Sequence, residues 1–286
     1  MTFTTLVDVT TLAAHQGASD WVVIDCRFEL GKPAVGEAAY AAGHIAGARY
    51  AHLDRDLAGP IGPETGRHPL PTPAEFAIKA GAWGIDGSTQ VVVYDQGNSF
   101  FAARAWWIFR WLGHSKVAVL DGGLTAWLAA GFPLETQSAP HSPRRFEPKV
   151  QDELVAQVAE IESLIHRHAF SASHRLVDAR GADRFAGDNE TIDPVGGHVP
   201  GAINHHYARN YGPDGRLLDA STLQARWRDT LGGADPCNMI AMCGSGVSAC
   251  VNLLALEHAG IKGARLYPGS WSEWIRDPAR PVAKGN

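Results

Sequence analysis

An internal repeat constrains the fold of this 286-residue chain more than any other feature of its sequence. Four short motifs of the first half recur in the second half in the same order, each about 150 residues further along. Two of them are Asp-x-Arg and Gly-His-x-x-Gly-Ala. The four motifs pair 25–27 with 178–180, 43–48 with 197–202, 92–95 with 240–243, and 122–127 with 269–274. Ordered matches at a nearly constant spacing indicate a duplicated domain.

The boundary between the two copies is expected in residues 138–150. This stretch contains three prolines, which predict a semi-rigid extended connector. We therefore expect an N-terminal domain over 1–137 and a C-terminal domain over 151–286. With 45% hydrophobic residues in the chain, each domain can bury a core of its own.

Short β-branched runs alternate with helical stretches in each half. The expected strands are 22–25, 90–94 and 117–120, then 175–178, 239–242 and 264–267. Thr72 and Glu75 predict a helix that starts with a capping box, and Ser221 and Gln224 predict another. This order of elements predicts an α/β fold, in which each domain is a mainly parallel sheet flanked by helices.

Composition and charge exclude several classes of function. The formal net charge of −5 leaves no basic excess for a nucleic-acid partner. No apolar run approaches the roughly 18 residues that a membrane span requires, and the first residues lack a basic targeting region, so we expect a cytoplasmic protein. The four cysteines are too few for a disulfide scaffold, and no metal-ligand spacing or nucleotide loop is evident. We expect reduced thiols and neither metal nor cofactor.

Cys243 follows a predicted buried strand and precedes a predicted helix. At that edge of a parallel sheet, the start of the next helix points unpaired N–H groups at any anion in the loop, and a thiolate is such an anion. Gly244 and Gly246 allow successive N–H groups to converge, and Ser245 and Ser248 can add hydroxyl donors. The pattern predicts a nucleophilic cysteine, whereas the alternative is a small buried residue without a reaction.

The other three cysteines, Cys26, Cys237 and Cys250, lack such a loop and are interpreted as structural. Together, the duplicated α/β pattern, the repeated motifs and the sequence Cys243-Gly-Ser-Gly-Val-Ser resemble the tandem rhodanese-type sulfurtransferases. The loop is most similar to that of the 3-mercaptopyruvate sulfurtransferases, whose pattern is Cys-Gly-Ser-Gly-Val-Thr/Ser. The thiosulfate:cyanide branch usually has a basic residue directly after the cysteine, where this chain has Gly244.

The resemblance covers nearly the whole chain and implies a reaction. Cys243 would take sulfane sulfur from 3-mercaptopyruvate as a persulfide, with the loop through Val247 holding the anionic donor. The acceptor would be cyanide, a small thiol or a protein thiol such as that of a thioredoxin-like protein. A thiosulfate:cyanide sulfurtransferase is the alternative.

The duplication also provides an internal control. Asp95 stands where Cys243 stands, and a carboxylate cannot accept sulfane sulfur, so the first domain is expected to be inactive. Its loop places Asn98 in line with Gly246 and the bulky Phe100 in line with Ser248. We therefore expect the first loop to lack a nest of converging N–H groups.

Comparison of the two halves also separates the arginines into two kinds. Arg27 and Arg180 each follow an aspartate in the repeated motif and are expected to form scaffold ion pairs. Arg184 has no counterpart in the first half, and the resemblance places an anion-binding arginine there; the alternative is a solvated surface arginine. Mercaptopyruvate-type members often carry a second anion-binding arginine a few residues further on, but 185–197 contains no arginine or lysine.

Two further candidate site residues, both in the first half, are indicated only by the resemblance. Asp54 and His68 match the positions from which mercaptopyruvate-type members draw an aspartate and a histidine that face the cysteine loop. With Ser245 they would form a Ser-His-Asp proton relay. The alternative is a surface histidine in a proline-rich loop.

Two other functions are weaker. A cysteine phosphatase needs Cys-x5-Arg to bind phosphate oxygens, and this chain has Ala249 in place of that arginine. A non-catalytic binding module would not need the intact loop of Cys243.

Overall fold

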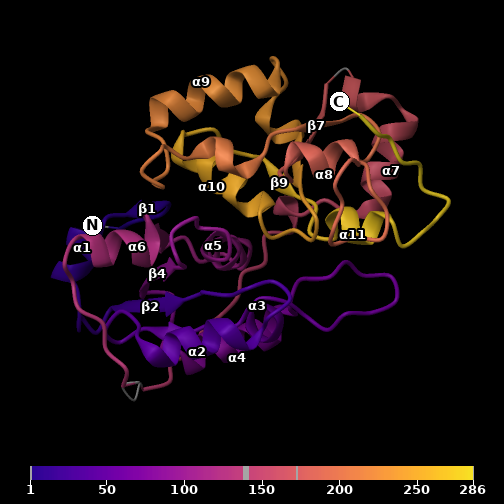
Figure 1. The fold of residues 1–286 in the computed structure, drawn as a ribbon. Coiled ribbons are helices and arrows are strands. Elements are labelled where there is room, and N and C mark those ends of the chain that lie inside the picture. Colours follow the sequence, from indigo (N-terminus) through magenta and orange to yellow (C-terminus); the bar gives the residue numbers. More distant parts are fainter. Residues whose placement is uncertain (1, 138–141, 172, 286) are drawn as a thin grey trace. The chain divides into compact units, whose positions relative to one another are not determined.

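The computed structural model describes residues 2–137, 142–171 and 173–285 (Figure 1). The chain forms two compact units that follow the repeat except for two exchanged segments. Unit 1 contains Met1–Gly59, Leu70–Gln151 and Pro213–Leu217, and unit 2 contains Pro60–Pro69, Asp152–Gly212 and Leu218–Asn286. The first half of the sequence therefore contributes a ten-residue segment to unit 2, and nothing in the repeat indicated this exchange.

Unit 1 is built on a five-stranded sheet with the order β1-β5-β4-β2-β3, in which every pairing is parallel. Its strands are β1 (Leu6–Val7), β2 (Trp21–Asp25), β3 (Arg49–Tyr50), β4 (Gln90–Tyr94) and β5 (Val117–Leu120). Its helices are α1 (Val9–Ala14), α2 (Ala34–Ala42), α3 (Leu53–Asp56), α4 (Pro73–Ala82), α5 (Ala102–Trp111) and α6 (Gly123–Ala129).

Unit 2 repeats this plan with a four-stranded parallel sheet of order β7-β6-β8-β9. Its strands are β6 (Arg175–Asp178), β7 (Ala202–Asn204), β8 (Met239–Met242) and β9 (Arg265–Leu266). Its helices are α7 (Val158–His166), α8 (Ala182–Ala186), α9 (Ala220–Leu231), α10 (Ala249–His258) and α11 (Ser270–Trp274). Short 3-10 turns lie at η1 (Asp152–Leu154), η2 (Ala169–Ser171), η3 (Tyr207–Asn210) and η4 (Pro236–Asn238).

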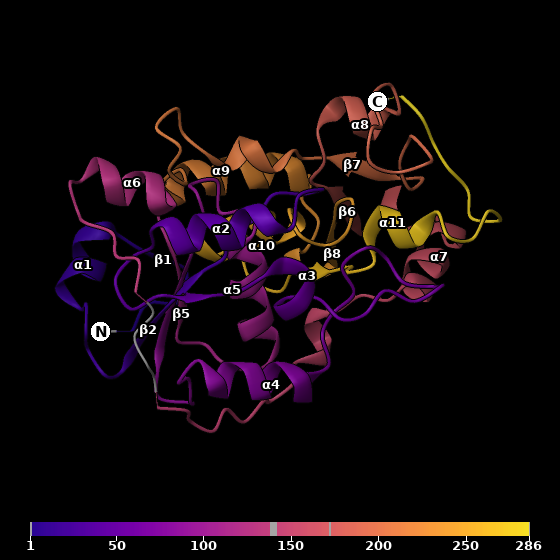
Figure 2. The same cartoon turned by 60° about the horizontal axis from the view of Figure 1, so that its bottom comes forward.

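The predicted α/β fold is confirmed, and each of the six predicted strands exists (Figure 1, Figure 2). The central strands β4 and β8 are buried along their whole length, as expected of strands that helices cover. The three strands that the sequence did not reveal, β1, β3 and β7, have only two or three residues each and are too short to show a period. None of the helices in the described part of the chain is long and apolar enough to span a membrane.

One of the two predicted helix starts is correct. Thr72 and Glu75 form the capping box of α4, with the Thr72 side chain accepting from the Glu75 N–H at 3.2 Å. The second prediction is wrong, because α9 begins at Ala220 and its N-cap is Asp219. The Asp219 carboxylate accepts from the Thr222 N–H at 3.0 Å and from the hydroxyl groups of Ser221 and Thr222, and these bonds lower the pKa of Asp219. A charged acceptor at a helix start outcompetes a neutral hydroxyl for that position.

The repeated motifs meet in the same way in each unit. In unit 1, the Asp25 carboxylate is fully buried and pairs with the Arg27 guanidinium at 2.6 Å, and Arg27 also donates to the carbonyl of Gly43 at 2.7 Å. Asp-x-Arg thus joins the end of β2 to the Gly-His turn. The same contacts in unit 2 involve Asp178, Arg180 and Gly197. The predicted scaffold ion pairs are confirmed.

Candidate active site

The loop after β8 is fixed to α11 at its first two residues. The Cys243 N–H donates to Ser270 Oγ at 3.0 Å, and the Cys243 carbonyl accepts from the Trp271 N–H at 3.0 Å. The Gly244 carbonyl accepts from the Ser272 N–H at 2.9 Å. These bonds hold the thiol, which is 2% exposed as a residue, at the carboxyl end of the sheet and in front of α10.

Gly246 makes the turn that returns the chain to α10. Its φ is +73°, and a Cβ atom at this position would lie 2.4 Å from the carbonyl oxygen of Pro268. Only glycine combines this conformation with this close approach. The Cys250 thiol donates to the Gly246 carbonyl at 3.3 Å, which agrees with a structural part for Cys250. All four cysteines are free thiols.

The segment Pro60–Pro69 of unit 2 brings His68 to this loop. His68 Nδ1 lies 2.7 Å from Ser245 Oγ, and both residues are buried. The two side chains that the expected relay would join are therefore within hydrogen-bond distance, and the relay itself stays a prediction. Asp54 lies in the first turn of α3 in unit 1, where its N–H donates to His52 Nδ1 at 3.1 Å. The part of Asp54 in a relay also stays a prediction.

Three contacts besides that of His68 anchor the same segment to α11 and its neighbours. The Arg67 N–H donates to Ser272 Oγ at 3.0 Å, and Arg276 Nε donates to the Thr65 carbonyl at 3.1 Å. Gly66 lies so close to Gly269 that a Cβ atom on Gly66 would approach the Gly269 carbonyl oxygen within 2.4 Å.

Arg184, the predicted anion-binding residue, lies on α8 and contacts two carboxylates. Its Nε lies 3.1 Å from both oxygens of Glu190, and its Nη2 lies 2.9 Å from Glu190 and 3.3 Å from Asp193. Although burial opposes ionisation of Glu190, the hydrogen bonds from Arg184 and from two backbone N–H groups lower its pKa. Burial raises the pKa of Asp193.

Arg67 was not identified from the sequence, although it directly precedes His68. Its Nη1 pairs with Asp193 Oδ1. A Cβ atom on Gly244 would lie 2.9 Å from Arg67 Nη2 and 3.6 Å from Arg184 Nη2, so both guanidinium groups reach the face of the cysteine loop. The stretch after Arg184 has no arginine, but the folded chain supplies one from more than a hundred positions earlier.

The corresponding loop of unit 1 corrects one expectation. The buried Asp95 carboxylate accepts four backbone N–H groups at 2.9–3.2 Å, those of Gly97, Ser99, Phe101 and Ala102. Burial raises the pKa of Asp95, while these bonds act in the opposite direction. The prediction that this loop lacks a nest of N–H groups is wrong.

The reason is that backbone direction, not side-chain type, forms the nest. The left-handed residue is Ser99 in unit 1, with φ +52°, and Gly246 in unit 2, with φ +73°. The first loop therefore reaches its turn one residue later than the sequence alignment suggested. In unit 2, within the described residues, the N–H groups of Ser245, Val247 and Ser248 have no protein acceptor. They are available to an anion that the loop holds.

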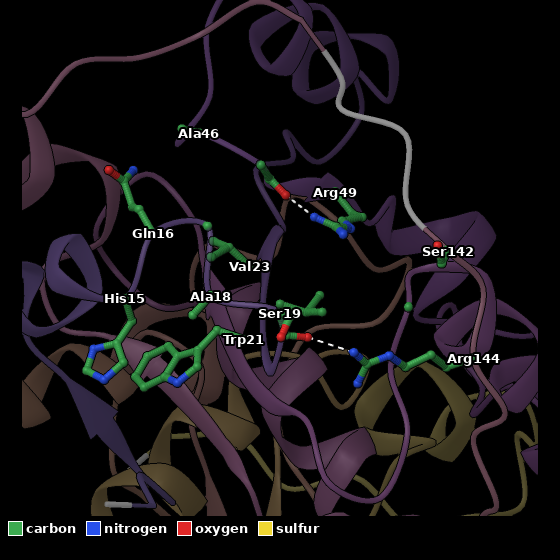
Figure 3. Close-up of a pocket in the computed structure, with 14 residues that line it drawn as sticks. His15, Gln16, Ala18, Ser19, Trp21, Val23, Ala46, Arg49, Ser142 and Arg144 are labelled. Atoms are coloured by element: carbon green, nitrogen blue, oxygen red, sulfur yellow. Dashed lines mark hydrogen bonds between the residues drawn. The ribbon is translucent and has the colours of Figure 1, made fainter.

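Among the described residues of unit 1 lie three cavities, and none of them involves the residues just described in unit 2; one, of about 370 Å³, lies between α4 and 143–146. One of about 240 Å³ is lined by the Asp95 loop together with Arg27 and Phe28. Figure 3 shows another, of about 350 Å³, in which Arg49 and Arg144 direct their guanidinium groups at the carbonyls of Gly47 and Ser19.

Comparisons with known proteins agree with this architecture. Residues 8–130 and 158–277 each match the rhodanese-like domain. A Pseudomonas aeruginosa protein named "Probable 3-mercaptopyruvate sulfurtransferase" is 46% identical over 283 residues, which cover 98% of each chain. A thiosulfate sulfurtransferase of Cricetulus griseus is 33% identical over 256 residues, which cover 86% of this chain and 82% of the relative.

Solved structures show the same similarity. The crystal structure of SseA from Escherichia coli, a representative of the rhodanese fold of 3-mercaptopyruvate sulfotransferases, matches with a TM-score of 0.81 and 32% identity, over 94% of this chain and 100% of SseA. The 3-mercaptopyruvate sulfurtransferase from Leishmania major matches with a TM-score of 0.82 and 31% identity, over 96% of this chain and 75% of its own.

Proposed function

Because the chain belongs to the rhodanese-like domain family, with two copies of the domain, we propose that it is a sulfurtransferase that uses 3-mercaptopyruvate as donor. Cys243 is the nucleophile in this proposal. The observation that supports it most is the set of groups on the loop that carries this cysteine: N–H groups without a protein acceptor among the described residues, the His68–Ser245 hydrogen bond, and the guanidinium groups of Arg67 and Arg184 beside Gly244.

The first half-reaction transfers sulfur to the enzyme. The Cys243 thiolate attacks the sulfur of 3-mercaptopyruvate, a sulfur–sulfur bond forms, and the carbon–sulfur bond breaks. Its electron pair stays on carbon as the enolate of pyruvate, which takes up one proton to become pyruvate. In this proposal Ser245 hydrogen-bonds the developing enolate and His68 supplies the proton, which the distance of 2.7 Å between His68 Nδ1 and Ser245 Oγ supports.

The second half-reaction returns the thiolate. A nucleophilic acceptor, cyanide or a thiol, attacks the outer sulfur of the Cys243 persulfide, and the sulfur–sulfur bond breaks to release the Cys243 thiolate. The N–H groups of the loop from Gly244 to Ser248 would stabilise the negative charge on the Cys243 sulfur, which is present before the first step and returns when the second step releases the thiolate. A thioredoxin-like protein as physiological acceptor and a cytoplasmic location stay predictions.

The donor assignment depends on which charges lie next to the nucleophile. Residue 244 itself has no basic side chain to offer a compact dianion such as thiosulfate, and the cations nearest to it are the guanidinium groups of Arg67 and Arg184. Their planar, forked N–H edges match a carboxylate, which supports 3-mercaptopyruvate as the donor. Thiosulfate is the alternative donor, because one relative of this chain is named a thiosulfate sulfurtransferase. Unit 1 has Asp95 in place of the nucleophile and is proposed to be inactive.

The test is intact-protein mass spectrometry after incubation with each donor, followed by steady-state kinetics with cyanide. We expect a one-sulfur mass increase on Cys243 with 3-mercaptopyruvate, and a higher kcat/KM for this donor than for thiosulfate. A higher kcat/KM for thiosulfate would move the protein to the thiosulfate branch. No added sulfur with either donor would favour a binding module.

A further inference from the structure

We propose that Arg67 is a second donor-binding arginine, which Asp193 holds beside Arg184 over the face of Gly244, so that the two guanidinium groups together bind the carboxylate of the donor. The inference rests on the proposed function for the identity of the donor. The existence of an anion site at this position does not depend on the proposed function.

Each of the two arginines has one terminal guanidinium nitrogen that is not used in a contact with a carboxylate. Arg67 Nη1 is occupied by Asp193, and Arg184 Nε and Nη2 are occupied by Glu190 and Asp193. Arg67 Nη2 and Arg184 Nη1 have no protein acceptor within the described residues. These two atoms lie 2.9 Å and 3.9 Å from the place where Gly244 would carry a Cβ atom. Two free N–H edges therefore face one small volume next to the nucleophile.

A carboxylate matches that volume. Its two oxygens can accept from two guanidinium groups at once, and such charged hydrogen bonds are stronger than neutral ones. A side chain at 244 would compete for the same volume, because its Cβ atom would lie 2.9 Å from Arg67 Nη2 and the guanidinium would have to shift.

Arg67 differs from an ordinary surface arginine in how firmly its backbone is held. Its N–H is bonded to Ser272, and the next residue, His68, is bonded to Ser245. The side chain itself is 28% exposed, so a dissolved anion can reach it, while that of Asp193 is 3% exposed. The Arg67 N–H and the neighbouring His68 side chain are both held while the charged end of Arg67 stays accessible, which is what a pre-organised binding group requires.

Asp193 acts as the positioning residue. Its two oxygens bind different arginines, Oδ1 to Arg67 and Oδ2 to Arg184, and so set the spacing of the two guanidinium groups. The wider cluster is balanced, because Arg67, Arg180 and Arg184 face Asp178, Glu190 and Asp193. The arginines do not outnumber the carboxylates, so the site would bind an anion through directed N–H groups rather than through an excess of positive charge.

The experiment compares two alkylating reagents on the full-length protein. Iodoacetamide is neutral and iodoacetate carries a carboxylate, and both react with the Cys243 thiolate. In Arg67→Gln we expect the iodoacetate rate to fall roughly tenfold or more, the size of one lost charged hydrogen bond, with the iodoacetamide rate within about twofold. Arg228→Gln is the matched control, since Arg228 is an exposed arginine of α9 in the same unit.

Kinetics give the second readout. In Arg67→Gln the KM for 3-mercaptopyruvate should rise roughly tenfold while kcat changes little, and Arg67→Lys should recover part of the loss because it restores the charge without the fork. Asp193→Asn should raise KM as well, through the misplaced guanidinium groups.

An unchanged ratio of the two alkylation rates in Arg67→Gln would overturn the proposal, whatever the donor. If instead the ratio falls but the wild-type protein turns over neither donor, the anion site stands and the proposed function fails.

Discussion

Replacement of Gly246 by alanine tests whether the loop of Cys243 depends on its backbone conformation. Two effects add at this position. An L-residue at φ +73° costs about 1–2 kcal/mol relative to glycine. The new Cβ atom would also lie 2.4 Å from the oxygen and 2.9 Å from the Cα of Pro268.

These neighbours are backbone atoms and cannot rotate away, so the overlap adds about 1–3 kcal/mol, as overpacking of a core does. The expected loss in the free energy of unfolding is then about 2–5 kcal/mol. The matched control is Gly260→Ala, since Gly260 lies in the same unit, has φ +77° and has nothing within 4 Å of its added Cβ atom. Gly260→Ala should lose only the about 1–2 kcal/mol that an L-residue costs at a positive φ.

Urea unfolding of both variants measures the difference, and the rate of alkylation of Cys243 by iodoacetamide reports on the loop. We expect Gly246→Ala to be the less stable variant by about 1–3 kcal/mol and to react more slowly, while Gly260→Ala reacts at the wild-type rate. Equal stabilities, or equal alkylation rates, would show that the loop yields to the methyl group and that its conformation is not what makes the thiol reactive.

Three further predictions concern single side chains. Cys243→Ser should abolish sulfur transfer in a cyanide assay, whereas serine at any of the other three cysteines should leave most of the activity; loss in one of those, with the fold intact, would contradict the assignment. His68→Ala should lower kcat with 3-mercaptopyruvate much more than with thiosulfate, because sulfite leaves without a proton, and equal losses would exclude His68 as the proton donor. Asp95→Leu should destabilise unit 1 by about 2–6 kcal/mol, since the two buried N–H groups of Ser99 and Ala102 lose their acceptor at about 1–3 kcal/mol each. The half-buried N–H groups of Gly97 and Phe101 lose theirs at a smaller cost, and Asp95→Asn should cost less than the leucine because it keeps one acceptor oxygen. Urea unfolding in which the leucine variant equals the asparagine variant would refute this reading of the nest.

Local and repeated signals predicted most of the fold. The β-branched runs, the Thr72 capping box and the Asp-x-Arg pairs each depend on neighbouring residues or recur in both halves, so one sequence is sufficient to find them. The predicted N-cap of α9 was wrong because Asp219 and Ser221 are both residues that can cap a helix. Only the folded chain shows that the Asp219 side chain accepts the hydrogen bond from the Thr222 N–H.

The parts of the site that sequence reasoning missed depend on contacts between distant residues or on backbone angles. Arg67 and Asp193 are separated by 126 positions, and no periodicity reports such a pair. The nest around Asp95 depends on where φ becomes positive, and Ser99 takes that conformation although glycine would be the usual choice. His68 could be singled out only through the family resemblance.

The transfer of Pro60–Pro69 to unit 2 has a consequence for how the gene can be divided. A fragment that ended at residue 137 would encode the histidine without the cysteine, and one that began at residue 151 would encode the cysteine without the histidine. During synthesis, this segment leaves the ribosome long before the strands and helices of unit 2 on which it packs have been made. Recombination between relatives that joined two unmatched halves would separate Arg67 from Asp193 as well, and such halves are therefore expected to be inherited together.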